Sequence, residues 1–142
     1  MTNFTTRMMI AAATLVVAAG AASAQTMKAE IPFTFRANGA VMAAGTYRVT
    51  LSQTSGVPVL YFFNHEAKRA AIALAQSRND PPKAWQAAGN PMLSFRCGAK
   101  VCSLAGVWSG SGSPAYSFAA PKLDKNESTH VALVVLRTSN SD

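Results

Sequence analysis

Cys97 and Cys102 are the residues of this sequence whose type and spacing point most directly to chemistry. They are its only cysteines, and four residues separate them. A redox-active pair has two intervening residues, and a zinc site requires further Cys or His ligands nearby. In a chain that leaves the cytosol, an even number of cysteines favours a disulfide. The sequence therefore predicts a structural bond between Cys97 and Cys102 across a four-residue turn, with no catalytic role for either sulfur.

The histidines, serines and carboxylates do not form a recognisable catalytic or metal-binding pattern. His65 and His130 have no metal-ligand residue type two or four positions away. Gly110-Ser111-Gly112 lacks the G-x-S-x-G spacing of a hydrolase nucleophile turn. The carboxylates all lie in expected loops or chain ends, and they are Glu30, Glu66, Asp80, Asp124, Glu127 and Asp142. The sequence therefore predicts no catalytic residue, no metal ligand and no cofactor.

The two tryptophans lead to different predictions. Trp85 lies in residues 77–91, where two adjacent prolines disfavour a regular helix or strand. Segments of this length without secondary structure are often functional. Trp85 is therefore the residue predicted to contact a ligand, the alternative being that its indole plugs the core. Trp108 has the same strand parity as Leu104 and is predicted to pack in the core beside it.

Alternation of apolar and polar residues with a period of two dominates the chain after residue 30. Tyr47, Val49 and Leu51, for example, alternate with polar neighbours as in a half-buried strand. Further strands are expected at residues 31–36, 57–63, 69–76, 93–97, 102–108 and 129–137. These segments predict an all-β fold, a single antiparallel β-sandwich or flattened β-barrel of about seven strands.

Residues 57–63 are apolar on both faces of their expected strand. This pattern suits a central strand that is covered on both sides, or one flank of a protein contact. If the strands closed into a barrel, its cavity would be lined by Phe33, Phe35, Tyr47 and Tyr61. Such a cavity would suit a carrier of small apolar ligands.

The first 24 residues have the features of a secretory signal peptide. Arg7 provides a positive start, an uncharged apolar run follows, and Ala22-Ser23-Ala24 has the small residues of a signal-peptidase site. The run is rich in alanine and shorter than the ~20 strongly apolar residues of a membrane-spanning helix, so no transmembrane anchor is expected. We predict cleavage after Ala24, which leaves residues 25–142 as a single secreted β domain, periplasmic or extracellular.

Basic residues outnumber acidic ones. The net charge is +7, and it becomes +6 when Arg7 is removed with the leader. The basic residues are spread along the chain, and no nucleic-acid-binding module is recognisable. Nucleic acid is therefore not an expected partner, whereas anionic envelope components or another protein are.

Two motifs near the start of the mature domain resemble a known family. Residues 29–35 read A-E-I-P-F-T-F, and residues 43–49 read A-A-G-T-Y-R-V. They resemble a family of small exported bacterial proteins that open with an I-P-F-x-F strand followed by an L-P-A-G-x-Y-x-V strand. This chain has Met42-Ala43 in place of the Leu-Pro, while residues 93–95, Gly98 and Val107-Trp108 are similar to the family's second half. The resemblance implies an all-β bacterial domain and carries over no catalytic or binding residues.

These observations favour a non-enzymatic exported β domain that acts as a binding or envelope-associated structural module. Two alternatives stay open. One is the small apolar-ligand carrier. The other is an enzyme of unrecognised type that acts on a cell-wall or polysaccharide substrate through Asp80 and residues near Trp85. An open cleft in which Asp80 and His65 converge would favour the enzyme.

Overall fold

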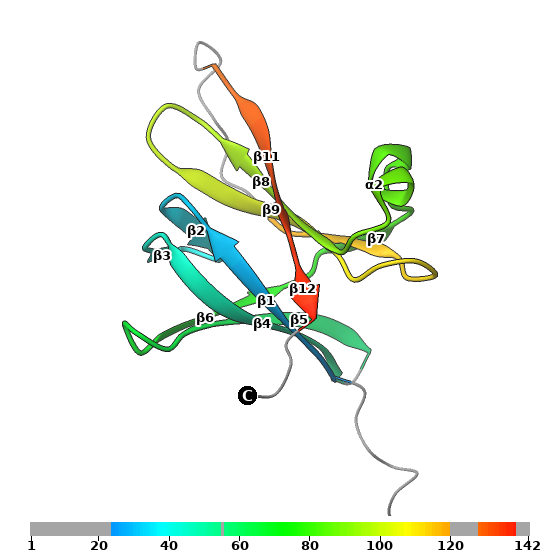
Figure 1. The fold of residues 1–142 in the computed structure, drawn as a ribbon, viewed down its shortest axis with the longest axis horizontal. Coiled ribbons are helices and arrows are strands. Elements are labelled where there is room, and N and C mark those ends of the chain that lie inside the picture. The colour runs from blue at the N-terminus through cyan, green and yellow to red at the C-terminus, as the bar shows by residue number, and fades with distance from the viewer. Residues whose placement is uncertain (1–23, 55, 120–127, 139–142) are drawn as a thin grey trace, which may run out of the picture.

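The computed structural model describes residues 24–54, 56–119 and 128–138, which form two β-sheets (Figure 1). Sheet A has the strand order β12-β1-β4-β5-β6, and sheet B has the order β11-β8-β9-β10-β7, with β2 also paired to β9 and β3 to β2. The elements are β1 (Ala24–Ile31), β2 (Phe35–Ala37), β3 (Ala40–Met42), β4 (Gly45–Thr54), β5 (Val57–Asn64), β6 (Arg69–Leu74), β7 (Ser77–Asn79), α2 (Lys83–Ala88), β8 (Met92–Cys97), β9 (Cys102–Trp108), β10 (Ala115–Ser117), β11 (His130–Val135) and β12 (Arg137–Thr138).

The all-β sandwich that the sequence predicts is confirmed, and the barrel alternative is wrong because each sheet ends in open edges. The expected number of about seven strands is too low, since the part of the chain that the structure describes contains twelve. Five of these, β2, β3, β7, β10 and β12, have only two or three residues. A period of two cannot be recognised over so short a length.

The chain crosses between the two sheets at four places, after β1, β3, β6 and β11. The single strand expected at residues 31–36 is wrong, because β1 of sheet A ends at Ile31 and β2 of sheet B begins at Phe35. Pro32 has no N–H to continue the ladder, so the strand stops there and the chain changes sheets. The chain returns to sheet A between Met42 and Gly45. At the crossings after β6 and β11, hydrogen bonds run from Gln76 N to the Ser117 carbonyl (2.8 Å) and from Leu136 N to the Pro91 carbonyl (2.8 Å).

The core between the sheets is centred on Phe35, which is fully buried. Its ring contacts those of Tyr47, Phe62 and Phe95, with centroids 5.2, 5.5 and 5.4 Å away. These residues come from both sheets, so the ring cluster joins them. The cavity lining expected of a carrier is not formed by the described residues, because Phe35 and Tyr47 pack against each other and Tyr61 points outward with 39% of its surface exposed.

A β-bulge in sheet B reverses the expected orientation of Trp108. Ser94 pairs with Gly106 and Phe95 with Leu104, so Ala105 is an extra residue in β9. After the bulge, Val107 lies in the core and Trp108 faces the other side of the sheet, opposite Met92. Trp108 is buried there, and its indole N–H donates to the Ser113 carbonyl at 2.9 Å.

Residues 77–91 contain β7 and α2, so the expectation of no regular element there is wrong. The adjacent prolines precede the helix: Pro82 is its N-cap, where a missing N–H costs no helical hydrogen bond. Gly89 ends the helix in the left-handed conformation with φ +76° and donates to the Trp85 carbonyl.

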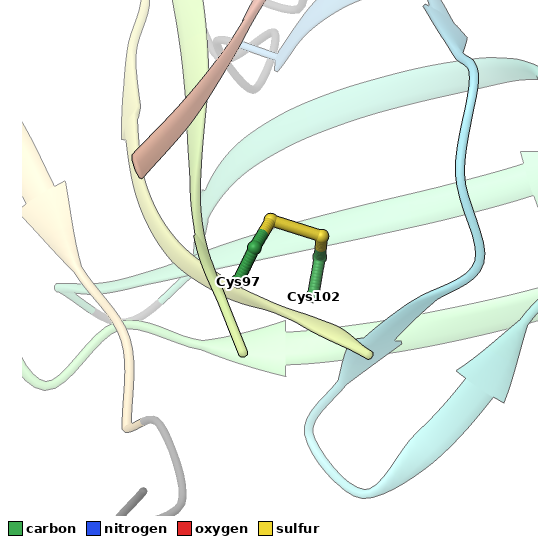
Figure 2. Close-up of a disulfide and its surroundings, with 2 residues drawn as sticks. All are labelled: Cys97 and Cys102. Carbon is green, nitrogen blue, oxygen red and sulfur yellow. A yellow bond between two sulfur atoms is a disulfide. The ribbon is translucent and has the colours of Figure 1, made fainter. Parts of the chain in front are cut away.

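The two cysteines form the predicted disulfide (Figure 2). Cys97 is the last residue of β8 and Cys102 the first of β9, and they are directly paired across the hairpin. Gly98 N donates to the Val101 carbonyl at 3.1 Å and closes the predicted four-residue turn. Cys97 lies in the core and Cys102 packs against the core, so the disulfide holds this end of the hairpin against the sandwich interior.

Replacement of both cysteines, by Cys97→Ser and Cys102→Ser, is expected to lower the free energy of unfolding by about 2 kcal/mol. The effect is modest because the bond closes only a short loop, and the variant is expected to fold. Urea unfolding of the oxidised protein and of the variant measures the difference, with the reduced wild-type protein as the control. An unfolded variant at neutral pH, or one as stable as the oxidised protein, would contradict this expectation.

Candidate functional site

Three cations lie side by side on the outer face of sheet A. Lys28 of β1 pairs directly with Arg137 of β12 on one side and with Arg48 of β4 on the other. All three side chains are exposed. Directly paired residues point to the same face of a sheet, with Cβ atoms about 4.5–5.5 Å apart. We call Arg137, Lys28 and Arg48 the cation row.

Within the described residues, no carboxylate neutralises the charges of the cation row. No ion pair joins any of the three to another described residue, including Glu30, two positions further along β1. Like charges directly opposite each other destabilise a sheet. The row spans about 10 Å, two strand spacings, which is close to the screening length at physiological ionic strength. A bound anion would relieve this repulsion.

An apolar surface continues from the cation row across β5 and β6. Arg48 pairs with Phe63, and beyond it Tyr61 of β5 pairs with Ile72 of β6. We call the exposed members of this surface the apolar patch, and they are Val57, Tyr61, Ile72 and Leu74. The outer face of sheet A is therefore cationic on β12, β1 and β4 and apolar on β5 and β6.

Strand β6 explains why the apolar patch is exposed. The predicted alternation is present, but Ala71 and Ala73 face the core while Ile72 and Leu74 are 50% and 55% exposed. Large aliphatic side chains thus point to solvent on a strand whose small ones point inward. Of the two interpretations of residues 57–63, burial on both faces is wrong, because Tyr61 and Val57 are exposed.

A second surface feature lies where the two sheets meet, between β1 and β11. These strands are close together at β12 and splay apart from there (Figure 1). The hollow between them has a volume of about 370 Å³. We call it the wedge, and it is lined by Lys28, Glu30, Pro32, Phe33, Leu133, Val134, Val135, Arg137 and Thr138.

The residues that the sequence singled out for enzymatic chemistry lie on separate elements. Asp80 follows β7 and lines a polar hollow of about 590 Å³ together with Arg78, Asn79 and the turn at residues 112–114. His65 is in the turn between β5 and β6, with its ring 4.7 Å from that of Phe63. The lining of the Asp80 hollow does not include His65. The structure therefore gives no cleft at Asp80 in which the two converge.

Trp85 lies on α2, half-buried over the outer face of sheet B. Its Cη2 atom is 3.7 Å from the position that a Cβ of Gly106 would occupy. Trp85 therefore packs on the sheet where Gly106 leaves room for it. Its contact with a ligand stays a prediction.

The residues that the structure describes contain no group of three or more His, Cys, Asp or Glu side chains placed to hold a metal ion. Their helical part is too short and too polar to cross a lipid bilayer.

Comparisons with protein-family models, curated proteins and solved structures found no match to this chain. The resemblance to small exported bacterial β proteins therefore stays a prediction from sequence. What the fold and the surface define is a β-sandwich whose sheet A presents a face that is half cationic and half apolar.

Proposed function

We propose that this protein is an exported, non-enzymatic binding module whose sheet A docks on an anionic lipid surface. The observation that carries the proposal is the cation row lying directly beside the apolar patch on one sheet face. Surfaces that bind at a membrane interface combine cations for the anionic headgroups with apolar side chains that enter the headgroup region. An anionic polysaccharide would pair with the cations but would offer no apolar environment for the exposed aliphatic side chains.

The leader sequence supports export. Residues 1–23 lie outside the described part of the chain, and β1 begins at Ala24. Cleavage after Ala24 removes a single pair, Ala24 with Ser52, from the ladder between β1 and β4. The remaining register from Gln25 to Ile31 is kept, so processing there is compatible with the sandwich. The disulfide fits an oxidising compartment.

Vesicle co-sedimentation of residues 25–142 tests the proposal. We expect binding to vesicles of phosphatidylglycerol mixed with phosphatidylcholine, and little binding to phosphatidylcholine alone. Each cation near an anionic surface contributes roughly a fivefold increase in affinity, so replacing the cation row by glutamine should weaken binding roughly 100-fold. High salt should also weaken it, because the attraction is screened.

A matched triple variant distinguishes the effect of the cation row on vesicle affinity from the effect of net charge. Replacement of Arg78, Lys83 and Arg96 by glutamine removes the same charge from exposed positions on β7, α2 and β8. This variant is expected to lose less than about fivefold in vesicle affinity. The proposed face would be ruled out if both triple variants lost the same vesicle affinity. It would also be ruled out if the unaltered protein bound phosphatidylcholine vesicles as tightly as the mixed vesicles.

A further inference from the structure

The wedge between β1 and β11 combines an open strand edge with a hollow of ligand size. Within the described residues β11 pairs only with β8, so its other edge offers unpaired backbone groups. The ladder between β1 and β12 covers only Met27 and Lys28, which leaves the same edge of β1 open beyond Lys28. Volumes of roughly 300–1,000 Å³ are typical of ligand pockets. The wedge, at about 370 Å³, falls in this range.

We propose that the wedge binds the C-terminal end of an extended partner peptide as an added strand of sheet B. An edge strand bordering a groove is the geometry used for strand addition, where backbone hydrogen bonds supply affinity and alternate side chains supply specificity. Leu133 and Val135 of β11 are 49% and 45% exposed. Natural edge strands usually carry charges or proline that block such pairing, and β11 has neither.

The chemistry of the lining selects the occupant. Pro32 and Phe33 on one side face Leu133 and Val135 on the other, so apolar side chains of the peptide find apolar walls. The wedge closes at Lys28 and Arg137, two directly paired cations, with Glu30 as the only carboxylate in the lining. This excess of positive charge complements the free carboxylate at the end of a peptide.

The direction of the added strand follows from the position of the cations. Because β11 runs toward Arg137, a peptide whose carboxylate lies there runs parallel to β11. Sheet B already contains one parallel pair, β2 with β9. A second copy of residues 25–142 is a poorer occupant, because each copy carries a net charge of +6 and the wedge is itself cationic.

Fluorescence anisotropy of residues 25–142 with a defined peptide tests the proposal. The probe is a fluorescein-labelled heptapeptide of alternating valine and threonine with a free C-terminal carboxylate, and its carboxamide form is the control. We expect saturable binding of the carboxylate form and about fivefold weaker binding of the carboxamide, the upper range for an exposed ion pair. Absence of binding by both forms, or equal binding of the two, would overturn the proposal.

Two matched leucine variants locate the binding site and separate this proposal from membrane docking. Leu133→Asn in β11, which adds no charge beside the cation row, is expected to weaken peptide binding about tenfold and to leave vesicle binding unchanged. Leu74→Asn, on the equally exposed edge strand β6, is expected to do the reverse. Both positions are exposed, so the melting temperature should change little. Equal effects of the two variants on the peptide would contradict the assignment, and so would sedimentation showing a dimer that Leu133→Asn dissociates.

Discussion

Phe35→Ala is expected to lower the free energy of unfolding by about 3–5 kcal/mol, the range for removing a buried phenylalanine ring. The effect is large because the ring of Phe35 contacts Tyr47 and Phe62 from sheet A and Phe95 from sheet B. Its removal leaves a void where the two sheets meet, and the rigid strands around it cannot close the space. Domains of this size are stable by about 5–15 kcal/mol, so the variant should be close to unfolding at 37 °C.

Urea unfolding followed by circular dichroism measures this loss, and Tyr61→Ala is the matched control. Tyr61 is also an aromatic residue of a strand, but it faces solvent on the apolar patch. Its replacement is expected to cost less than about 1 kcal/mol. A similar loss for both variants would mean that Phe35 does not join the sheets as described.

Gly106→Val is expected to cost about 1–3 kcal/mol through overpacking. A Cβ at this position would lie 2.9 Å from Ser94 Oγ and 3.2 Å from the carbonyl oxygen of Tyr116. The carbonyl belongs to β10, which is paired to β9, so it has little freedom to move. Gly106 does not have a positive φ, so the steric contact alone determines the cost.

The same variant should also displace Trp85, whose indole lies over Gly106. The expected readout is a red shift of tryptophan emission, since displaced Trp85 becomes more exposed to water. The double variant Ser94→Ala with Gly106→Ala removes the shortest contact and should recover part of the stability lost by Gly106→Ala alone. Unchanged stability and emission in Gly106→Val would show that α2 packs elsewhere.

Local sequence patterns predicted those parts of the fold that local geometry determines. The alternation of Tyr47, Val49 and Leu51 placed these residues in the core, and all three are buried. The expected strands at residues 57–63 and 69–76 are joined by a turn in which the Asn64 side chain accepts hydrogen bonds from the backbone of Glu66 and Ala67. The disulfide followed from the even number of cysteines and their spacing across a short turn.

The errors arise where one residue changes the parity or ends an element. Ala105 forms a bulge, and a single extra residue moves every later side chain of β9 to the opposite face, Trp108 included. Pro32 divides one expected strand between two sheets. In residues 77–91 the prolines mark the start of a helix, a context that the prolines alone do not reveal.

The candidate site depends on strand order, which no local pattern contains. Lys28, Arg48 and Arg137 are far apart in sequence and become neighbours only because β1 lies between β4 and β12. The only indication of this site in the sequence was Arg48, which alternates with the apolar residues Tyr47 and Val49 and therefore points outward. The inward face of β6 was also undetermined, because alanine and isoleucine are both apolar. Since β6 lies close to β2 and β3, the short side chains of Ala71 and Ala73 suit the inner side.

The pairing of β12 with β1 has a consequence for the order in which the domain can be built. Arg137 and Thr138, from the last described strand, close the sheet beside Lys28 and Met27, from the first. A chain that emerges from its N-terminus onward therefore lacks this contact until residues 137–138 have emerged. Pairings between such distant residues also slow folding, which places it in the millisecond to second range of all-β domains. The edge of β1 at Met27 and Lys28 therefore stays unpaired until Arg137 and Thr138 reach it, although β1, β4, β5 and β6 can pair earlier.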